Sequence, residues 1–159
     1  MLLTVVFFVS LAVLFGLGRW LARGWPWPYL LGGLLFGIYN EFFFEGCWTY
    51  SPKMAPFIWR DVPLVVVLGW CAMGGFALSL TDRLLSKRTV VPRVDWHQMG
   101  LDILIFVIQG SAQEVGLSRA GLWQYNVDIQ KLVPVEFLGY IGVGLLMSSL
   151  GRRFRGRPA

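Results

Sequence analysis

Long apolar runs, each of a length that can cross a lipid bilayer, constrain this chain more than any other feature of its sequence. A transmembrane helix needs about 17–25 mainly apolar residues. Runs of this kind cover residues 2–22, 27–46, 61–82, 98–117 and 133–151. Only 14% of the 159 residues are charged, against roughly 25% in a soluble domain. We therefore expect an all-α, polytopic membrane bundle of five helices, with residues 1–151 as one domain and residues 152–159 as a basic cytoplasmic tail.

Lysine and arginine are distributed unevenly among the loops that would join these helices. With the N-terminus outside, the outer loops hold four of the 14 basic residues, namely Lys53, Arg60, Arg119 and Lys131. Cytoplasmic loops of membrane proteins carry the excess of positive charge, so we expect a multi-pass protein of the cell (inner) membrane, N-out and C-in. The first run has no positive charge before it, unlike a signal peptide, so we expect a retained helix.

One arrangement of residues occurs twice, between the second and third runs and again between the fourth and fifth. Each copy has an amide–carboxylate pair, a Gly-x-Trp-x-Tyr segment, and a Val-Pro dipeptide that opens the next run. The first copy is Asn40-Glu41, Gly46 to Tyr50 and Val62-Pro63, and the second is Gln113-Glu114, Gly121 to Tyr125 and Val133-Pro134. The repetition predicts two tandem helix hairpins, helices 2–3 and helices 4–5, with the first helix outside the repeat.

Four glutamates and three amides fall in the outer third of the expected membrane region. The glutamates are Glu41, Glu45, Glu114 and Glu136, and the amides are Asn40, Gln109 and Gln113. Ionisable side chains inside a membrane are costly and are usually functional, so we interpret these residues as a site. The alternatives are that Glu136 stabilises a helix N-terminus and that Glu45 is hydrated at the headgroups.

Within this group, Glu41 and Glu114 stand at equivalent positions of the two copies. We predict that they are the catalytic proton donor and acceptor, in either order, with Glu45 and Glu136 in support. The three amides would orient the acids or a water molecule. Four aromatic residues of the two Gly-x-Trp-x-Tyr segments would line or cover a chamber: Trp48, Tyr50, Trp123 and Tyr125. An interfacial aromatic belt is the alternative for these four.

Two expectations concern packing rather than chemistry. Gly33 and Gly37 share a face of the second helix, where small residues allow another helix to approach closely. Asp102 lies near the inner end of the fourth helix and could pair with Arg83 or Arg93, whereas Asp82 is expected in solvent.

Several classes of chemistry are disfavoured by the residues themselves. His97 is the only histidine and is placed in an inner loop, which argues against histidine-rich di-iron sites, haem ligation and zinc hydrolysis. The sequence has neither a glycine-rich phosphate loop nor an Asp-x-x-x-Asp pair for magnesium-held diphosphate. We therefore expect no metal and no cofactor. Carboxylates in an apolar, aromatic chamber suit protonation of an alkene, because aromatic faces stabilise a nearby cation.

The second copy of the repeated arrangement resembles a known family. Its Gly121-Leu-Trp123-Gln-Tyr125-Asn126 segment, followed by Val133-Pro134-Val135-Glu136, is similar to the turn and the Pro-x-Glu helix start of small membrane carotenoid cyclases. These are the heterodimeric lycopene cyclases and their fungal-type relatives. The first copy resembles the same pattern, with no glutamate after Pro63. The resemblance implies a cofactor-free, isoprenoid-modifying membrane enzyme with Glu136 among its acids.

These observations together predict an integral membrane enzyme that performs carboxylate acid/base chemistry on an isoprenoid or another lipid. The reaction would be a cyclisation, a hydration or an isomerisation, and nucleic acid is not an expected partner. Two alternatives stay open. The same acids could serve a small proton- or cation-coupled transporter or channel, or they could pair with arginines of a larger membrane complex. Homo-oligomerisation is equally open.

Overall fold

The computed structural model of the chain describes residues 2–44, 46–86, 95–126, 128, 139, 141–142 and 144–153. These residues are mostly helical, as the apolar runs predict. Glu45 and Glu136, two of the four candidate glutamates, lie outside the described residues.

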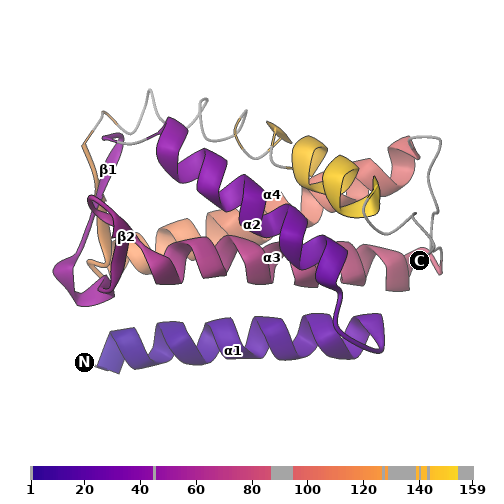
Figure 1. The fold of residues 1–159 in the computed structure, drawn as a ribbon, viewed down its shortest axis with the longest axis horizontal. Coiled ribbons are helices and arrows are strands. Elements are labelled where there is room, and N and C mark those ends of the chain that lie inside the picture. The colour runs from indigo at the N-terminus through magenta and orange to yellow at the C-terminus, as the bar shows by residue number, and fades with distance from the viewer. Residues whose placement is uncertain are drawn as a thin grey trace.

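Long helices make up the described part of the bundle (Figure 1). They are α1 (Leu2–Ala22), α2 (Trp27–Phe43), α3 (Leu64–Leu84), α4 (Trp96–Arg119) and the helical residues 144–153. Pro28 lies in the first turn of α2, where a missing N–H costs no helical hydrogen bond. α4 begins after Asp95, whose carboxylate accepts hydrogen bonds from the backbone N–H groups of His97 and Gln98.

Three of the described helices, α1, α3 and α4, are long and apolar enough to cross a membrane. α2 has 17 residues. At 1.5 Å per residue it is about 26 Å long, slightly less than the roughly 30 Å of a hydrocarbon core. The fifth predicted run, residues 133–151, falls largely outside the described residues. The prediction of membrane-length helices is thus confirmed for three of the five runs.

α3 is the central helix of this arrangement, and both α1 and α2 pack along it (Figure 1). The contact with α2 requires glycine. A Cβ added at Gly37 would lie 2.6 Å from the Cβ of Trp70, and one added at Gly33 would collide with the backbone carbonyl of Trp70. The small-residue face predicted from the sequence therefore packs against α3, and it sets the α2 backbone directly against Trp70.

Short strands, which the all-α expectation did not include, close one end of the bundle. β1 (Trp48–Tyr50) pairs antiparallel with β4 (Trp123–Tyr125), with Trp48 opposite Tyr125 and Tyr50 opposite Trp123. The two Trp-x-Tyr segments therefore pair with each other. The short helix η1 (Pro52–Met54) follows β1, and β2 (Phe57–Trp59) pairs with β3 (Val62–Pro63). We call the end of the bundle that carries β1 to β4 the strand end (Figure 1).

Two apolar clusters fill the interior. One lies towards the strand end and joins α1, α3 and the strands through Leu11, Met54, Val65, Val66, Ala72, Leu122 and Trp123. The other lies farther from the strands and joins α2, α3, α4 and the C-terminal helix through Tyr29, Phe36, Met73, Ala77, Leu78, Phe106 and Met147. Beyond the second cluster is the opposite end of the bundle, which carries Arg19, Arg23, Arg83 and Arg152 and which we call the arginine end.

Candidate functional site

A cavity of about 80 Å³ lies beneath the paired strands, and helices α1 to α4 all contribute to its wall. Its polar lining comes from Asn40, Glu41, Gln113 and Glu114, and its aromatic lining from Phe7, Phe44, Trp48, Tyr50, Trp70 and Trp123. A cavity needs roughly 10–15 Å³ of this kind of volume to hold one water molecule. The space therefore accommodates several waters or the end of a ligand rather than a whole long lipid.

Glu41 is the most completely enclosed carboxylate of this cavity. It lies near the end of α2 and is only 2% exposed. The hydroxyl of Tyr50 donates to its Oε2 at 2.6 Å, and the indole N–H of Trp70 donates to its Oε1 at 2.9 Å. An indole N–H can only donate, so Oε1 is an acceptor in either protonation state. A proton taken up by Glu41 therefore resides on Oε2, which then donates to the Tyr50 hydroxyl oxygen instead of accepting from it.

Glu114 occupies the matching place on α4. It is partly exposed, lines the same cavity, and accepts a hydrogen bond at Oε2 from the hydroxyl of Tyr125. Each Gly-x-Trp-x-Tyr segment thus supplies a tyrosine to the carboxylate of its own copy. The antiparallel pairing of β1 with β4 then holds these two tyrosine–glutamate pairs together at one end of the bundle.

The pKa of Tyr50 is affected by both carboxylates of the cavity. Burial raises the pKa of its hydroxyl well above the ordinary value, and the negative charge of Glu41 and its hydrogen bond act in the same direction. Glu114 also raises the pKa of Tyr50 through its charge. The phenol consequently remains a protonated hydrogen-bond donor at physiological pH, within electrostatic reach of both acids.

The other predicted site residues are placed as follows. Asn40, Gln113, Trp48 and Trp123 line the cavity, and the ring of Trp123 meets that of Tyr50 edge-on at 6.0 Å. Tyr125 reaches the site through Glu114 rather than as part of the wall. Gln109 also lies outside the wall; both polar atoms of its amide are buried and have no hydrogen-bond partner among the described residues.

Trp70 is the main residue of the site that the sequence analysis did not include. It lies on α3, outside both repeated segments, and its ring packs edge-on against Phe36 at 5.2 Å. One signal for it exists in the sequence. A tryptophan in mid-helix, away from an interfacial belt, carries an N–H that needs an acceptor when it is buried, and Glu41 is that acceptor.

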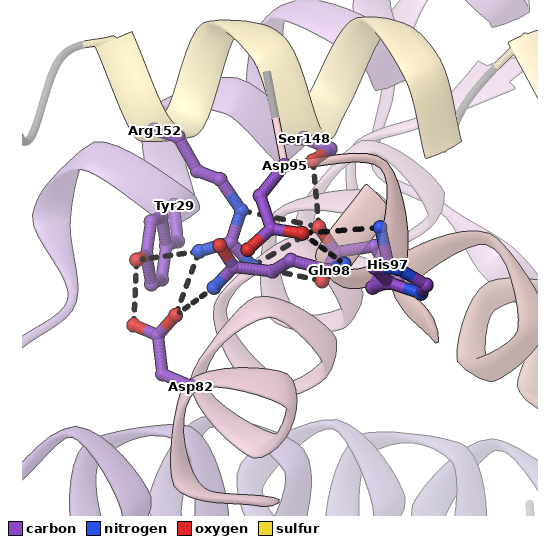
Figure 2. A network of polar contacts seen from close by, with 8 residues as sticks. Tyr29, Asp82, Asp95, His97, Gln98, Ser148 and Arg152 are labelled. Atoms are coloured by element: carbon purple, nitrogen blue, oxygen red, sulfur yellow. Dashed lines mark hydrogen bonds and ion pairs between the residues drawn. The ribbon is translucent and has the colours of Figure 1, made fainter. Parts of the chain in front are cut away.

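A second polar cluster occupies the arginine end (Figure 2). The guanidinium of Arg152 bonds the carboxylate of Asp82 at 2.6 Å and that of Asp102 at 2.9 Å. Ser148 donates to Asp102, while Tyr29 and Gln98 both donate to Asp82. Asp102 therefore pairs with Arg152 rather than with the expected Arg83 or Arg93, and Asp82 lies inside a network rather than in solvent. Arg152 itself is buried in the C-terminal helix and does not belong to an exposed tail.

The charged groups of this second cluster bond one another, so we interpret it as a structural contact between the C-terminal helix, α3 and α4 rather than as the reactive site. In the part of the chain that the structure describes, no group of three or more histidine, cysteine or acidic side chains could hold a metal ion. No protein-family model, curated protein or solved structure matches this chain. The functional interpretation therefore rests on the cavity and its two tyrosine–glutamate pairs.

Proposed function

We propose that this protein is a membrane enzyme that performs acid/base chemistry on an isoprenoid or a similar unsaturated lipid. The reaction class is cyclisation, hydration or isomerisation through a carbocation. One observation carries the proposal: Glu41 and Glu114, from different helices, line the same aromatic cavity. The resemblance of the two Trp-x-Tyr segments to small carotenoid cyclases supports the choice of an isoprenoid.

In this proposal the two glutamates exchange protons with the substrate. One carboxylic acid donates its proton to a carbon of a C=C bond, which forms a C–H bond and leaves a cation on the neighbouring carbon. The other carboxylate removes a proton from the substrate for isomerisation or cyclisation, or from a water that adds to the cation for hydration. For Glu41 the proton travels through Oε2 and the Tyr50 hydroxyl, because Oε1 is occupied by the indole N–H of Trp70.

The wall of the cavity suits a short-lived cation. Trp48, Trp70 and Trp123 line it, and an aromatic ring whose face meets a cation stabilises it by about 0.5–2 kcal/mol. Asn40 and Gln113 offer amide groups that can orient a water or the donor carboxyl. The small volume suits one end of a long polyene, whose remaining length would lie in the surrounding lipid.

We also propose that the chain crosses the membrane five times, N-out and C-in, as two tandem hairpins that follow α1. Support comes from the equivalence of the Tyr50–Glu41 and Tyr125–Glu114 pairs and from the pairing of the two Trp-x-Tyr segments. This placement puts the cavity towards the non-cytoplasmic side. Glu45 and Glu136 remain proposed supporting acids.

The proposal is tested with purified protein and a panel of linear isoprenoid polyenes, with products separated by chromatography. We expect turnover by the wild type and its loss in both Glu41→Gln and Glu114→Gln. Asp128→Asn is the matched control, because it removes one carboxylate from an exposed position outside the cavity. Turnover that survives unchanged in both glutamine variants would contradict the assignment.

A transporter is the weaker candidate. Between the cavity and the arginine end, α2, α3 and α4 pack through the apolar cluster that contains Phe36, Met73 and Phe106. These described residues present an apolar barrier where a single copy would need a polar path. Glu41-dependent proton flux into proteoliposomes, without any lipid product, would select the transporter instead.

A further inference from the structure

A second pocket, of about 550 Å³, lies at the arginine end, far from the glutamates. It is bounded by the last turns of α1 and α3. Arg19 and Arg23 reach it from the end of α1, and Arg83 reaches it from the end of α3. The rest of the lining is apolar side chain or glycine, namely Gly16, Trp20, Leu21 and Gly24. Three guanidinium groups from two neighbouring helices therefore border one hollow.

These three charges are not neutralised within the described part of the chain. Arg19 stacks its guanidinium over the ring of Trp25, and none of the three arginines forms an ion pair with a described residue. The neighbouring carboxylate, Asp82, lines an adjoining hollow with Arg23 and Arg83 and shares the cation Arg152 with Asp102, so it offsets at most one of the three positive charges. The pocket therefore carries a local excess of positive charge, which favours an anionic occupant.

The backbone at Arg23 is a second, independent observation. α1 ends in a hydrogen-bonded turn in which Gly24 N–H bonds the carbonyl of Arg19, and Arg23 N–H bonds that of Trp20. Such a turn places its first residue beyond the helix in the left-handed region, where glycine is usual. Here Arg23 has φ of +56°, in the left-handed region, which a residue with a side chain adopts only with strain. This turn brings the guanidinium of Arg23 to the pocket that Arg19 and Arg83 also line.

We propose that this pocket binds the phosphate headgroup of an anionic membrane lipid. Arginine forms paired, charge-assisted hydrogen bonds with phosphate oxygens, and basic pockets between transmembrane helices are suited to acidic headgroups. A lipid is favoured over a free anion because the rim continues into exposed apolar side chains. Trp20 is 71% exposed and Leu17 is 39% exposed, so both can contact the acyl chains of a bound lipid. The inference rests on the proposed membrane placement but not on the proposed chemistry.

The test measures lipid-dependent stability in a neutral detergent. The melting temperature is followed while dihexanoylphosphatidylglycerol is added, with dihexanoylphosphatidylcholine and inorganic phosphate as parallel titrations at equal ionic strength. We expect only phosphatidylglycerol to stabilise the wild type. In Arg83→Gln the concentration for half-maximal stabilisation should rise about tenfold, since a charge-assisted contact is lost. Arg19→Gln, on the other helix, should shift it in the same direction.

Arg153→Gln is the matched control, because it removes one exposed positive charge at the same end but outside the pocket. Its half-maximal concentration should stay within about twofold of the wild type. The proposal is overturned if phosphatidylglycerol gives no stabilisation, or if Arg83→Gln and Arg153→Gln respond alike, which indicates only general surface charge. Stabilisation by inorganic phosphate alone, with the same dependence on Arg83, would make this a free-anion site. The melting temperature is measured without any polyene, so this test can succeed or fail independently of the proposed enzyme activity.

Discussion

At the scale of single residues, Tyr50 joins the chemistry of the site to its stability. Its hydroxyl donates to Glu41 at 2.6 Å, and its pKa is raised by burial and then by the charges of Glu41 and Glu114. An unfolded tyrosine titrates near pH 10. The folded protein therefore holds this proton to higher pH than the unfolded chain does. The stabilisation is complete below about pH 10 and is lost as pH rises towards the folded pKa.

We expect this linkage to be visible in melting temperatures between pH 8 and pH 11. Tyr50→Phe should lower stability at pH 8 by about 1–3 kcal/mol, because a buried carboxylate oxygen loses its donor. The difference from the wild type should then shrink above about pH 10, where the wild type alone loses the contribution of Tyr50. Tyr39→Phe is the control, since this ring is 51% exposed. A constant difference at every pH would argue against the hydrogen bond.

The sequence identified most of this site, for a physical reason. Burying a carboxylate or an amide in a membrane-spanning helix costs free energy, so such residues in an apolar run are easily recognised as candidates. Glu41, Glu114, Asn40 and Gln113 were predicted for this reason, and all four line the cavity. Trp70 could not be chosen in this way, because its signal, an indole N–H in mid-helix that needs an acceptor, does not say which residue accepts, and Glu41 is identified only by the structure. The predicted catalytic roles stay predictions.

At the scale of helices and strands, the close contact between α2 and α3 positions Trp70. Gly37→Ala is the sharpest test, because the new Cβ would lie 2.6 Å from the Cβ of Trp70 and one of the two must move. We expect a loss of about 1–3 kcal/mol from overpacking. Turnover should also fall, as the indole N–H is displaced from Glu41. Gly100→Ala, where an added Cβ meets nothing within 4 Å, should leave both unchanged or slightly improved.

The C-terminal helix is held by a different kind of contact, the pairing of Arg152 with Asp82 and Asp102. Arg152→Gln leaves two enclosed carboxylates without their cation, and breaking a buried pair costs about 3–5 kcal/mol. We expect a large fall in melting temperature. Arg153→Gln, one residue further on and exposed, should have little effect. Equal effects of the two variants would show that net charge, rather than the network, is responsible.

Helix positions could be predicted well, whereas contacts between distant segments could not. The boundaries of α1 to α4 lie within about three residues of the apolar runs, because membrane-length helices follow hydropathy. The pairing of Trp48–Tyr50 with Trp123–Tyr125 joins segments 75 residues apart, and the partner of Asp102 is 50 residues away. Hydropathy and short motifs describe neighbouring residues only, so they do not predict which distant segments pair. The repeat and the meeting of its acids in one site were predicted, but the strand pairing between its two Trp-x-Tyr segments was not.

At the scale of the whole molecule, the two ends of the bundle differ in character. The strand end gathers the carboxylates and aromatic rings, and the arginine end gathers positive charge and the Arg152 network. The two pockets share no lining residue. Substitutions in one pocket therefore leave the lining of the other unchanged, so the two proposals can be tested separately.

Orientation is tested by labelling single cysteines in intact cells with a membrane-impermeant maleimide, in a background in which both native cysteines are replaced, Cys47 by serine and the buried Cys71 by alanine. Positive charge favours the cytoplasmic side, so the arginine end should face inwards. Lys53→Cys, in η1 at the strand end, should react in intact cells. Ser86→Cys, just beyond α3 at the arginine end, should react only after permeabilisation. If Ser86→Cys reacts in intact cells and Lys53→Cys reacts only after permeabilisation, the protein has the opposite orientation in the membrane. The acids would then open towards the cytoplasm, and the lipid pocket would face the leaflet on the other side.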